Sequence, residues 1–121
     1  MKSHWVYYNS VRIFLADFSN YGANGAGVKA ETQYIIQLLS NEPNNSVLSL
    51  TNVDGTFANE DVLSALSELL PVSNKKIKRR AVTGVTGFRR HFLDAFVAVI
   101  GNVKFSAFDT VEEAYEWLSK S

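Results

Sequence analysis

The segment Arg79–Arg90, RRAVTGVTGFRR, constrains the fold most strongly. Ala81, Val82 and Val85 predict a buried strand, and the Gly-Val-Thr-Gly turn after it opens into a helix with an apolar face. A strand that leads through a tight glycine turn into a helix leaves free backbone N–H groups above the sheet. We therefore expect the rest of the chain to supply neighbouring strands and covering helices for this unit.

Composition limits the classes of protein to consider. The 121 residues are enough for one domain with a hydrophobic core, and 12 basic residues balance 12 acidic ones, which argues against disorder and general nucleic-acid binding. The chain has no cysteine, which excludes disulfide scaffolds, cysteine-based zinc sites and thiol catalysis. The opening MKSHWVYYNS lacks the pattern of a signal peptide, and no stretch reaches the roughly 20 apolar residues of a membrane span. We expect a single cytoplasmic domain over residues 1–121.

The pattern of apolar residues predicts strands that alternate with helices. β-Branched and aromatic residues predict a hairpin and three further strands, one of them the strand within Arg79–Arg90; the others are Trp5–Asn9, Val11–Phe18, Ser46–Val53 and Val103–Phe108. Helical spacing predicts four helices: Val28–Leu39 with Glu31 off its buried side, Asn59–Leu70, one that stops at Gly101, and one that starts at Asp109. Ser19–Gly27 and Pro71–Lys78 are expected to be irregular connections, the first a surface loop or a lid.

This order of elements predicts an α/β fold. We expect a mostly parallel sheet of four to five strands, with an N-terminal β-hairpin that adds an antiparallel strand and with four covering helices. Val103–Phe108 alternates apolar and polar residues, which is typical of an edge strand.

Three local motifs carry a family resemblance. They are the strand-turn-helix unit at Ala81–Gly87, the strand end at Phe105–Asp109 and the closing EEAYEWL at Glu112–Leu118. In these the chain resembles small STAS-like (SpoIIAA-like) proteins. The resemblance implies a β-α superhelix, in a fold class that includes anti-sigma-factor antagonists and the larger CRAL-TRIO lipid carriers.

The chain departs from that family at its regulatory turn. Anti-sigma-factor antagonists carry a phosphorylated serine before the helix that follows the middle strand. The matching segment here, TNVDGT at Thr51–Thr56, has no serine, and Thr56 is the hydroxyl nearest to the helix. The phosphorylation switch therefore does not carry over by motif, and the chain is too short to enclose a lipid tail as the large carriers do.

Charged residues gather around the predicted glycine turn. The basic group contains Lys75, Lys76, Lys78, Arg79, Arg80, Arg89, Arg90 and His91. It could form a solvated surface with an Arg90–Asp94 helix pair, a docking surface for an acidic protein face, or an anion site in which the helix N–H groups act with Arg89 or Arg90. Nucleic acid is disfavoured because the aromatic residues fall in buried positions.

The sequence gives only weak evidence for catalytic or metal-binding residues at the strand ends. Parallel strands would gather Asp17, Asp54, Thr86 and Asp109 at one edge, yet the lysine and paired acids of a receiver-type site are missing, and turn or capping roles explain the aspartates. His4 and His91 have no neighbour that would make a nucleophile-base pair. We expect no catalytic residue, no metal site and no cofactor.

These observations favour a non-enzymatic regulatory or protein-interaction module of the STAS-like type. Its partner would be a protein with an acidic face. The alternative is a binder of a small anionic or amphiphilic ligand at the C-terminal edge of the sheet. The residues predicted to bind in either case are Gly84, Thr86, Gly87, Arg89, Arg90, Asp54 and Thr56. Pairing of the edge strand or the hairpin in a homodimer is also open.

Overall fold

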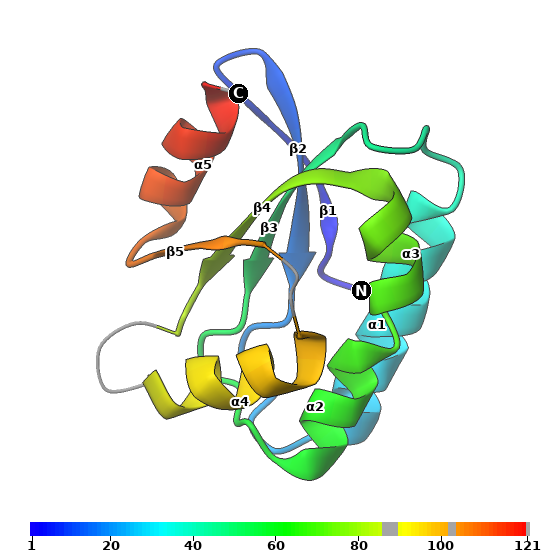
Figure 1. Cartoon of the computed structure of the whole chain (residues 1–121), viewed down its shortest axis with the longest axis vertical. Helices are drawn as coiled ribbons and strands as arrows, with labels where there is room; N and C mark the ends of the chain where they lie inside the picture. Colours follow the sequence, from blue (N-terminus) through cyan, green and yellow to red (C-terminus); the bar gives the residue numbers. More distant parts are fainter. Residues whose placement is uncertain (86–89, 102–103, 121) are drawn as a thin grey trace.

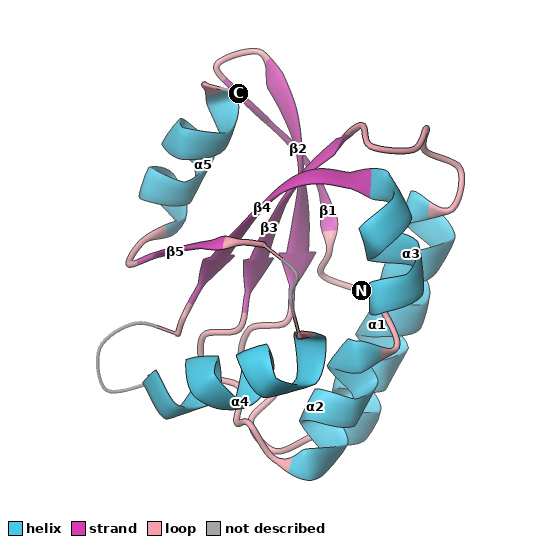
Figure 2. Cartoon of the chain, viewed as in Figure 1, coloured by secondary structure: helices cyan, strands magenta, loops and turns pink. Residues whose placement is uncertain are grey.

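A computed structural model describes residues 1–85, 90–101 and 104–120. Its strands are β1 (His4–Tyr8), β2 (Val11–Asp17), β3 (Val47–Asn52), β4 (Ile77–Thr83) and β5 (Ser106–Phe108). Its helices are α1 (Gly25–Leu39), α2 (Glu60–Ser67), α3 (Leu70–Lys76), α4 (Arg90–Ile100) and α5 (Val111–Ser119). Figure 1 follows the chain through these elements, and Figure 2 separates helices from strands.

The five strands form one mixed sheet in the order β1-β2-β3-β4-β5. β1 runs antiparallel to β2, and the pairs β2–β3, β3–β4 and β4–β5 are parallel. The α/β class and the N-terminal hairpin are confirmed. Asn9 and Ser10 both have positive φ, at 50° and 65°, as a two-residue hairpin turn requires.

The predicted strand number agrees with the structure, but the sheet is mixed rather than mostly parallel and the number of helices was wrong. The prediction of a mostly parallel sheet of four to five strands with four helices is replaced by a five-stranded mixed sheet with five helices among the described residues. The additional helix is α3, which occupies most of the predicted connection Pro71–Lys78. Proline lies in its first turn, where the missing N–H costs no helical hydrogen bond, so proline starts this helix rather than ending the previous one.

The helices cover the two faces of the sheet unequally (Figure 1). One face carries the larger core, to which α1, α2 and α4 contribute; it includes Phe14, Phe18, Ile35, Leu39, Val62 and Phe92. The other face is covered by α5, with Ile13, Leu50, Ala81, Ala114 and Leu118 buried together. Neighbouring residues of β2 therefore enter opposite cores, as the alternation of side chains along a strand requires.

The predicted loop Ser19–Gly27 is shorter and more tightly held than expected. α1 already begins at Gly25, because the side chain of Asn24 accepts a hydrogen bond from the Gly27 N–H at 2.9 Å and caps the helix. Gly22 forms a β-bridge with Thr56, and its N–H donates to the Gly55 carbonyl at 2.9 Å. These bonds attach the loop to the turn that follows β3, so its glycines serve a hydrogen-bonded loop rather than an unstructured one.

Candidate functional site

The structure brings together the turns that follow β3 and β4. Gly84 has φ +93°, and a Cβ added to it would lie 2.5 Å from the Asp54 backbone nitrogen. Only glycine satisfies both the backbone angle and this close approach. Gly84 and Asp54, two of the residues predicted to bind, are therefore direct neighbours.

The other predicted residues of the glycine turn lie outside the described part of the chain. These are Thr86, Gly87 and Arg89. Arg90 is the first residue of α4, and its side chain is also outside the described set, as is the predicted pair with Asp94. The anion site and the protein-docking surface assigned to this turn remain predictions.

Thr56 is buried and has a structural role. Its side chain is fully buried, and its hydroxyl donates to the Phe18 carbonyl and accepts from the Tyr21 N–H at 3.1 Å. The hydroxyl thus joins the loop after β2 to the turn after β3. Neither a kinase nor a ligand can reach it without opening this junction.

Of the three acidic residues predicted at the strand ends, Asp17 has local partners. Asp17 accepts from the Ser19 backbone N–H at 3.0 Å and lies 3.8 Å from the Lys2 ammonium. Asp54 and Asp109 are exposed. Among the described residues, no group of three or more acidic or histidine side chains is arranged to hold a metal ion.

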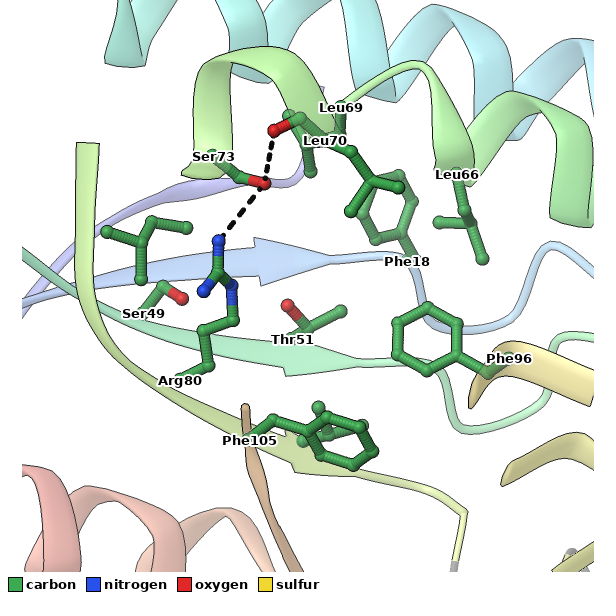
Figure 3. Close-up of a pocket in the computed structure, with 12 residues that line it drawn as sticks. Phe18, Ser49, Thr51, Leu66, Leu69, Leu70, Ser73, Arg80, Phe96 and Phe105 are labelled. Atoms are coloured by element: carbon green, nitrogen blue, oxygen red, sulfur yellow. Dashed lines mark hydrogen bonds between the residues drawn. The ribbon is translucent and has the colours of Figure 1, made fainter. Parts of the chain in front are cut away.

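A different group of polar side chains lies on the face of the sheet, at mid-strand. Ser49 of β3 and Arg80 of β4 are register partners, and the next partners on the same face are Thr51 and Val82. Val82 belongs to the larger core, so strand alternation directs Arg80 toward that core as well. Figure 3 shows Arg80 rising from β4 beside Ser49 toward the backbone of α3.

These side chains border a narrow cavity of about 50 Å³ between the sheet and the α2–α4 layer. The cavity is partly open, and its volume is several times the roughly 10–15 Å³ that one water molecule needs. Its apolar walls come from β4, from the loop after β2, from α2, α3 and the link between them, from α4 and from the segment before β5; they are Phe18, Leu66, Leu69, Leu70, Ile77, Val82, Phe96 and Phe105. The polar wall consists of Ser49, Thr51, Ser73 and Arg80.

The guanidinium of Arg80 is incompletely satisfied. It donates to the Asn74 side-chain oxygen at 3.0 Å and to the Ser73 hydroxyl at 3.4 Å, whereas a guanidinium has five N–H donors. No carboxylate among the described residues pairs with it. Burial lowers the pKa of Arg80. A partly desolvated cation that has only neutral partners is well suited to bind an anion.

Ser49 contributes a second unsatisfied group. Its side chain is 1% exposed, and its hydroxyl has no hydrogen-bond partner among the described residues. Buried hydroxyl groups are normally paired, because an unpaired one costs about 1–3 kcal/mol. The cavity therefore holds one cation with spare donors and one free hydroxyl, side by side on an otherwise apolar surface.

Sequence reasoning placed Arg80 in the basic group but did not single it out. A signal was available: Arg80 precedes Val82 by two residues on a buried strand, so both side chains share a face. Ser49 could not be identified in the same way, since serine is common in strands and its lack of a partner depends on the cavity beside it.

Comparison with known proteins gives no match: no family model, no curated protein and no solved structure matches the chain. The STAS-like resemblance and the regulatory or protein-interaction role therefore stay predictions. In the described residues, no helix is long and apolar enough to cross a lipid bilayer.

Proposed function

We propose that this protein is a non-enzymatic binding module for a small amphiphilic anion, held between Arg80 and the apolar cavity. The observation that carries the proposal is the half-buried Arg80 guanidinium, which faces apolar walls without a carboxylate partner among the described residues. This ligand class is the alternative that the sequence left open. Its position differs, because the cavity lies on the face of the sheet and not at the C-terminal edge.

The head group of the ligand is a carboxylate or a phosphate. Two donors of a guanidinium match two oxygens of such a group, and a charge-assisted hydrogen bond contributes about 1.5–3 kcal/mol. The Ser49 hydroxyl supplies a further donor next to Arg80 on the same face. Asn74 would continue to hold the guanidinium through its 3.0 Å bond.

The tail of the ligand is apolar and slender. Leucine, phenylalanine, isoleucine and valine side chains form the apolar part of the wall, so burial of each methylene gains about 0.8 kcal/mol. A cavity of about 50 Å³ excludes ring systems and bulky branched groups unless α2 and α3 move. Unbranched alkanoates are therefore the simplest test ligands.

Binding rather than catalysis is favoured by the chemistry of the wall. Arg80 is the one titratable residue among the described residues that line the cavity, and an arginine cannot act as a general base near neutral pH. We also retain the STAS-like β-α superhelix as a proposal. The order of consecutive βα units after an N-terminal hairpin supports it.

The test is isothermal titration calorimetry with sodium butyrate, hexanoate, octanoate and decanoate. We expect affinity to rise with chain length and then to level off once the cavity is filled. Arg80→Met keeps the length of the side chain but removes its charge, so it should weaken octanoate binding about ten- to hundredfold. Ser49→Ala should weaken it by a smaller factor.

Arg12→Met, the same substitution at another strand arginine, is the matched control. The Arg12 guanidinium lies 3.5 Å from the centre of the Trp5 ring and 2.9 Å from a Glu42 carboxylate oxygen, and Arg12 does not line the cavity. This variant should bind octanoate like the unmodified protein. Octanol that binds as tightly as octanoate, or an Arg80→Met variant with unchanged affinity, would show that Arg80 does not anchor an anion. No binding of any alkanoate would refute the proposal.

A further inference from the structure

The first half of β4 has a strand on one side only. β4 pairs with β3 from Ile77 to Thr83, with a register shift that leaves Lys78 without a partner residue on β3, whereas its pairing with β5 is confined to Ala81–Thr83. Upstream of Ala81 the two segments diverge, as Figure 1 shows. Ile77–Arg80 therefore presents an open strand edge among the described residues, about 13 Å long at 3.3 Å per residue.

A hollow of about 500 Å³ lies beside this edge. It is bordered by Lys78, Arg79 and Arg80 of β4, by Lys104, Phe105 and Ser106 at the start of β5, and by Trp117 of α5. Four of these seven side chains are cationic and none is acidic. No described carboxylate forms an ion pair with any of the four cations. In a chain of zero net charge this is a local excess of positive charge.

Trp117 lines the hollow and packs between Arg79 and Phe108. The Arg79 guanidinium lies 3.8 Å from the centre of the Trp117 ring, and that ring packs against Phe108 at 5.4 Å between centroids. A stacked guanidinium keeps its in-plane N–H donors available to an anion. Arg79 and Arg80 point to opposite faces of the sheet, so cations flank the open edge on both sides.

We propose that this edge and hollow form a docking site for an acidic peptide segment, which adds to β4 in extended conformation in the place that β5 leaves empty. Beyond the irregularity at Lys78, the open edge offers backbone N–H and C=O groups at a two-residue period, and a peptide backbone has the complementary pattern. Acidic side chains alternate to the two sides of such a strand, where the four cations lie. The specificity is for negative charge combined with a free backbone.

Other occupants fit less well. A duplex nucleic acid cannot pair with a strand edge, and the Trp117 ring, which could stack on a base, is already covered by Arg79. A second copy that paired symmetrically through Ile77–Arg80 would bring like charges together. The site is distinct from the proposed ligand cavity, although Arg80 and Phe105 border both.

The experiment is an NMR titration of the ¹⁵N-labelled protein with the capped hexapeptide Val-Glu-Glu-Glu-Glu-Val, whose consecutive glutamates point to both faces of an extended strand. We expect the largest shifts at the amides of Ile77–Arg80 and at the Trp117 indole. Two further peptides carry N-methyl groups at alternate backbone positions, one set for each edge of the strand. One set should bind about tenfold more weakly and the other like the parent, because only one edge can face β4.

Charge is tested separately, away from Arg80. Lys78→Glu and Lys104→Glu should each weaken binding of the acidic peptide several-fold. Lys29→Glu on α1 makes the same change of charge outside the hollow and should have little effect. These variants leave the polar wall of the ligand cavity intact, so octanoate binding should persist in them. A negative result in the peptide experiments would therefore not contradict the proposed ligand cavity.

Four outcomes would overturn the proposal. They are no saturable binding of the acidic peptide, shifts reproduced by free glutamate at equal carboxylate concentration, equal affinity of both methylated peptides, and a concentration-dependent dimer that buries Ile77–Arg80. The second outcome would indicate simple anion binding, and the fourth would assign the edge to another copy of the chain.

Discussion

Glu31 is a carboxylate buried in the larger core region. It is fully buried, accepts the Tyr21 hydroxyl at 2.6 Å, and accepts the backbone N–H groups of Ser3 at 3.0 Å and Lys2 at 3.3 Å. Sequence periodicity predicted Glu31 to lie off the buried side of its helix, and this was wrong. Helical spacing does not reveal the N-terminal segment, which packs across α1 and supplies the hydrogen bonds that make burial of a carboxylate tolerable.

The pKa of Glu31 gives a pH-dependent stability. Burial alone would raise this pKa, but the bonds from Tyr21, Ser3 and Lys2 favour the charged form, and the net shift is downward from 4.5. Since the folded pKa lies below the unfolded one, the stabilisation is complete above about pH 4.5 and is lost as pH falls through the folded pKa. Glu31→Gln should lower the free energy of unfolding by about 1–3 kcal/mol at pH 7.

Urea unfolding from pH 7 to pH 3 checks this expectation. The difference between the unmodified protein and Glu31→Gln should shrink as the carboxylate becomes protonated. Glu68→Gln, an exposed change at the end of α2, should stay within about 0.5 kcal/mol at every pH. A gap for Glu31→Gln that stays constant with pH would mean that its charge does not contribute.

Arg80 shows how much of the role of a single residue can be predicted from the sequence. Its facing toward the core follows from its spacing to Val82, so it could be predicted. The function of this position could not be predicted. Arg80 lacks a carboxylate partner because α3 meets its guanidinium, and the sequence pattern did not indicate a helix in this polar connection. The neutral Ser73 and Asn74 that meet the guanidinium belong to that helix.

At the level of elements, the start of α2 connects two parts of the chain. Asn59 accepts from the Val62 N–H at 2.8 Å, which caps the helix, and its amide also donates to the Ala23 carbonyl at 3.1 Å. The second bond joins the entrance of α2 to the loop before α1. The cap was readable from local sequence, whereas the partner 36 residues away was not.

Two substitutions separate these bonds. Asn59→Ala removes both and should lower the free energy of unfolding by about 0.5–2 kcal/mol. Asn59→Ser keeps an oxygen that caps the helix but cannot reach the Ala23 carbonyl, so its loss should be smaller. Chemical denaturation followed by circular dichroism measures both; equal losses would show that the cap contributes little and that the bond to Ala23 dominates.

Elements at the edge of the sheet were the hardest to predict. The strand expected at Val103–Phe108 contains β5, but β5 covers only Ser106–Phe108, and Lys104 precedes it. Alternation of apolar and polar residues extends beyond the paired part because Phe105 packs into the larger core without joining the ladder. Sequence alternation reports which side chains are buried, and it cannot report where a neighbouring strand turns away.

For the whole molecule, the two cores share one sheet. The α/β class, the hairpin and most helices could be predicted because each follows from local periodicity and turn residues. The division of the core into two unequal layers depends on packing between distant segments. Each layer happens to contain one of the two tryptophans: Trp5 packs on the larger core and Trp117 on the α5 side.

This arrangement allows a test of cooperativity between the two layers. The strands β2, β3 and β4 contribute side chains to both cores, so separation of α5 would expose one face of strands that hold the other core together. We expect Trp5→Phe, which reports through Trp117, and Trp117→Phe, which reports through Trp5, each to show a fluorescence transition that coincides with its own far-UV circular dichroism transition in urea. Comparison within each variant removes the effect of the substitution on stability. A Trp117 signal that changes at lower urea than the circular dichroism would instead mean that α5 detaches first, and the smaller core would then be an independently stable layer on a sheet held by the larger one.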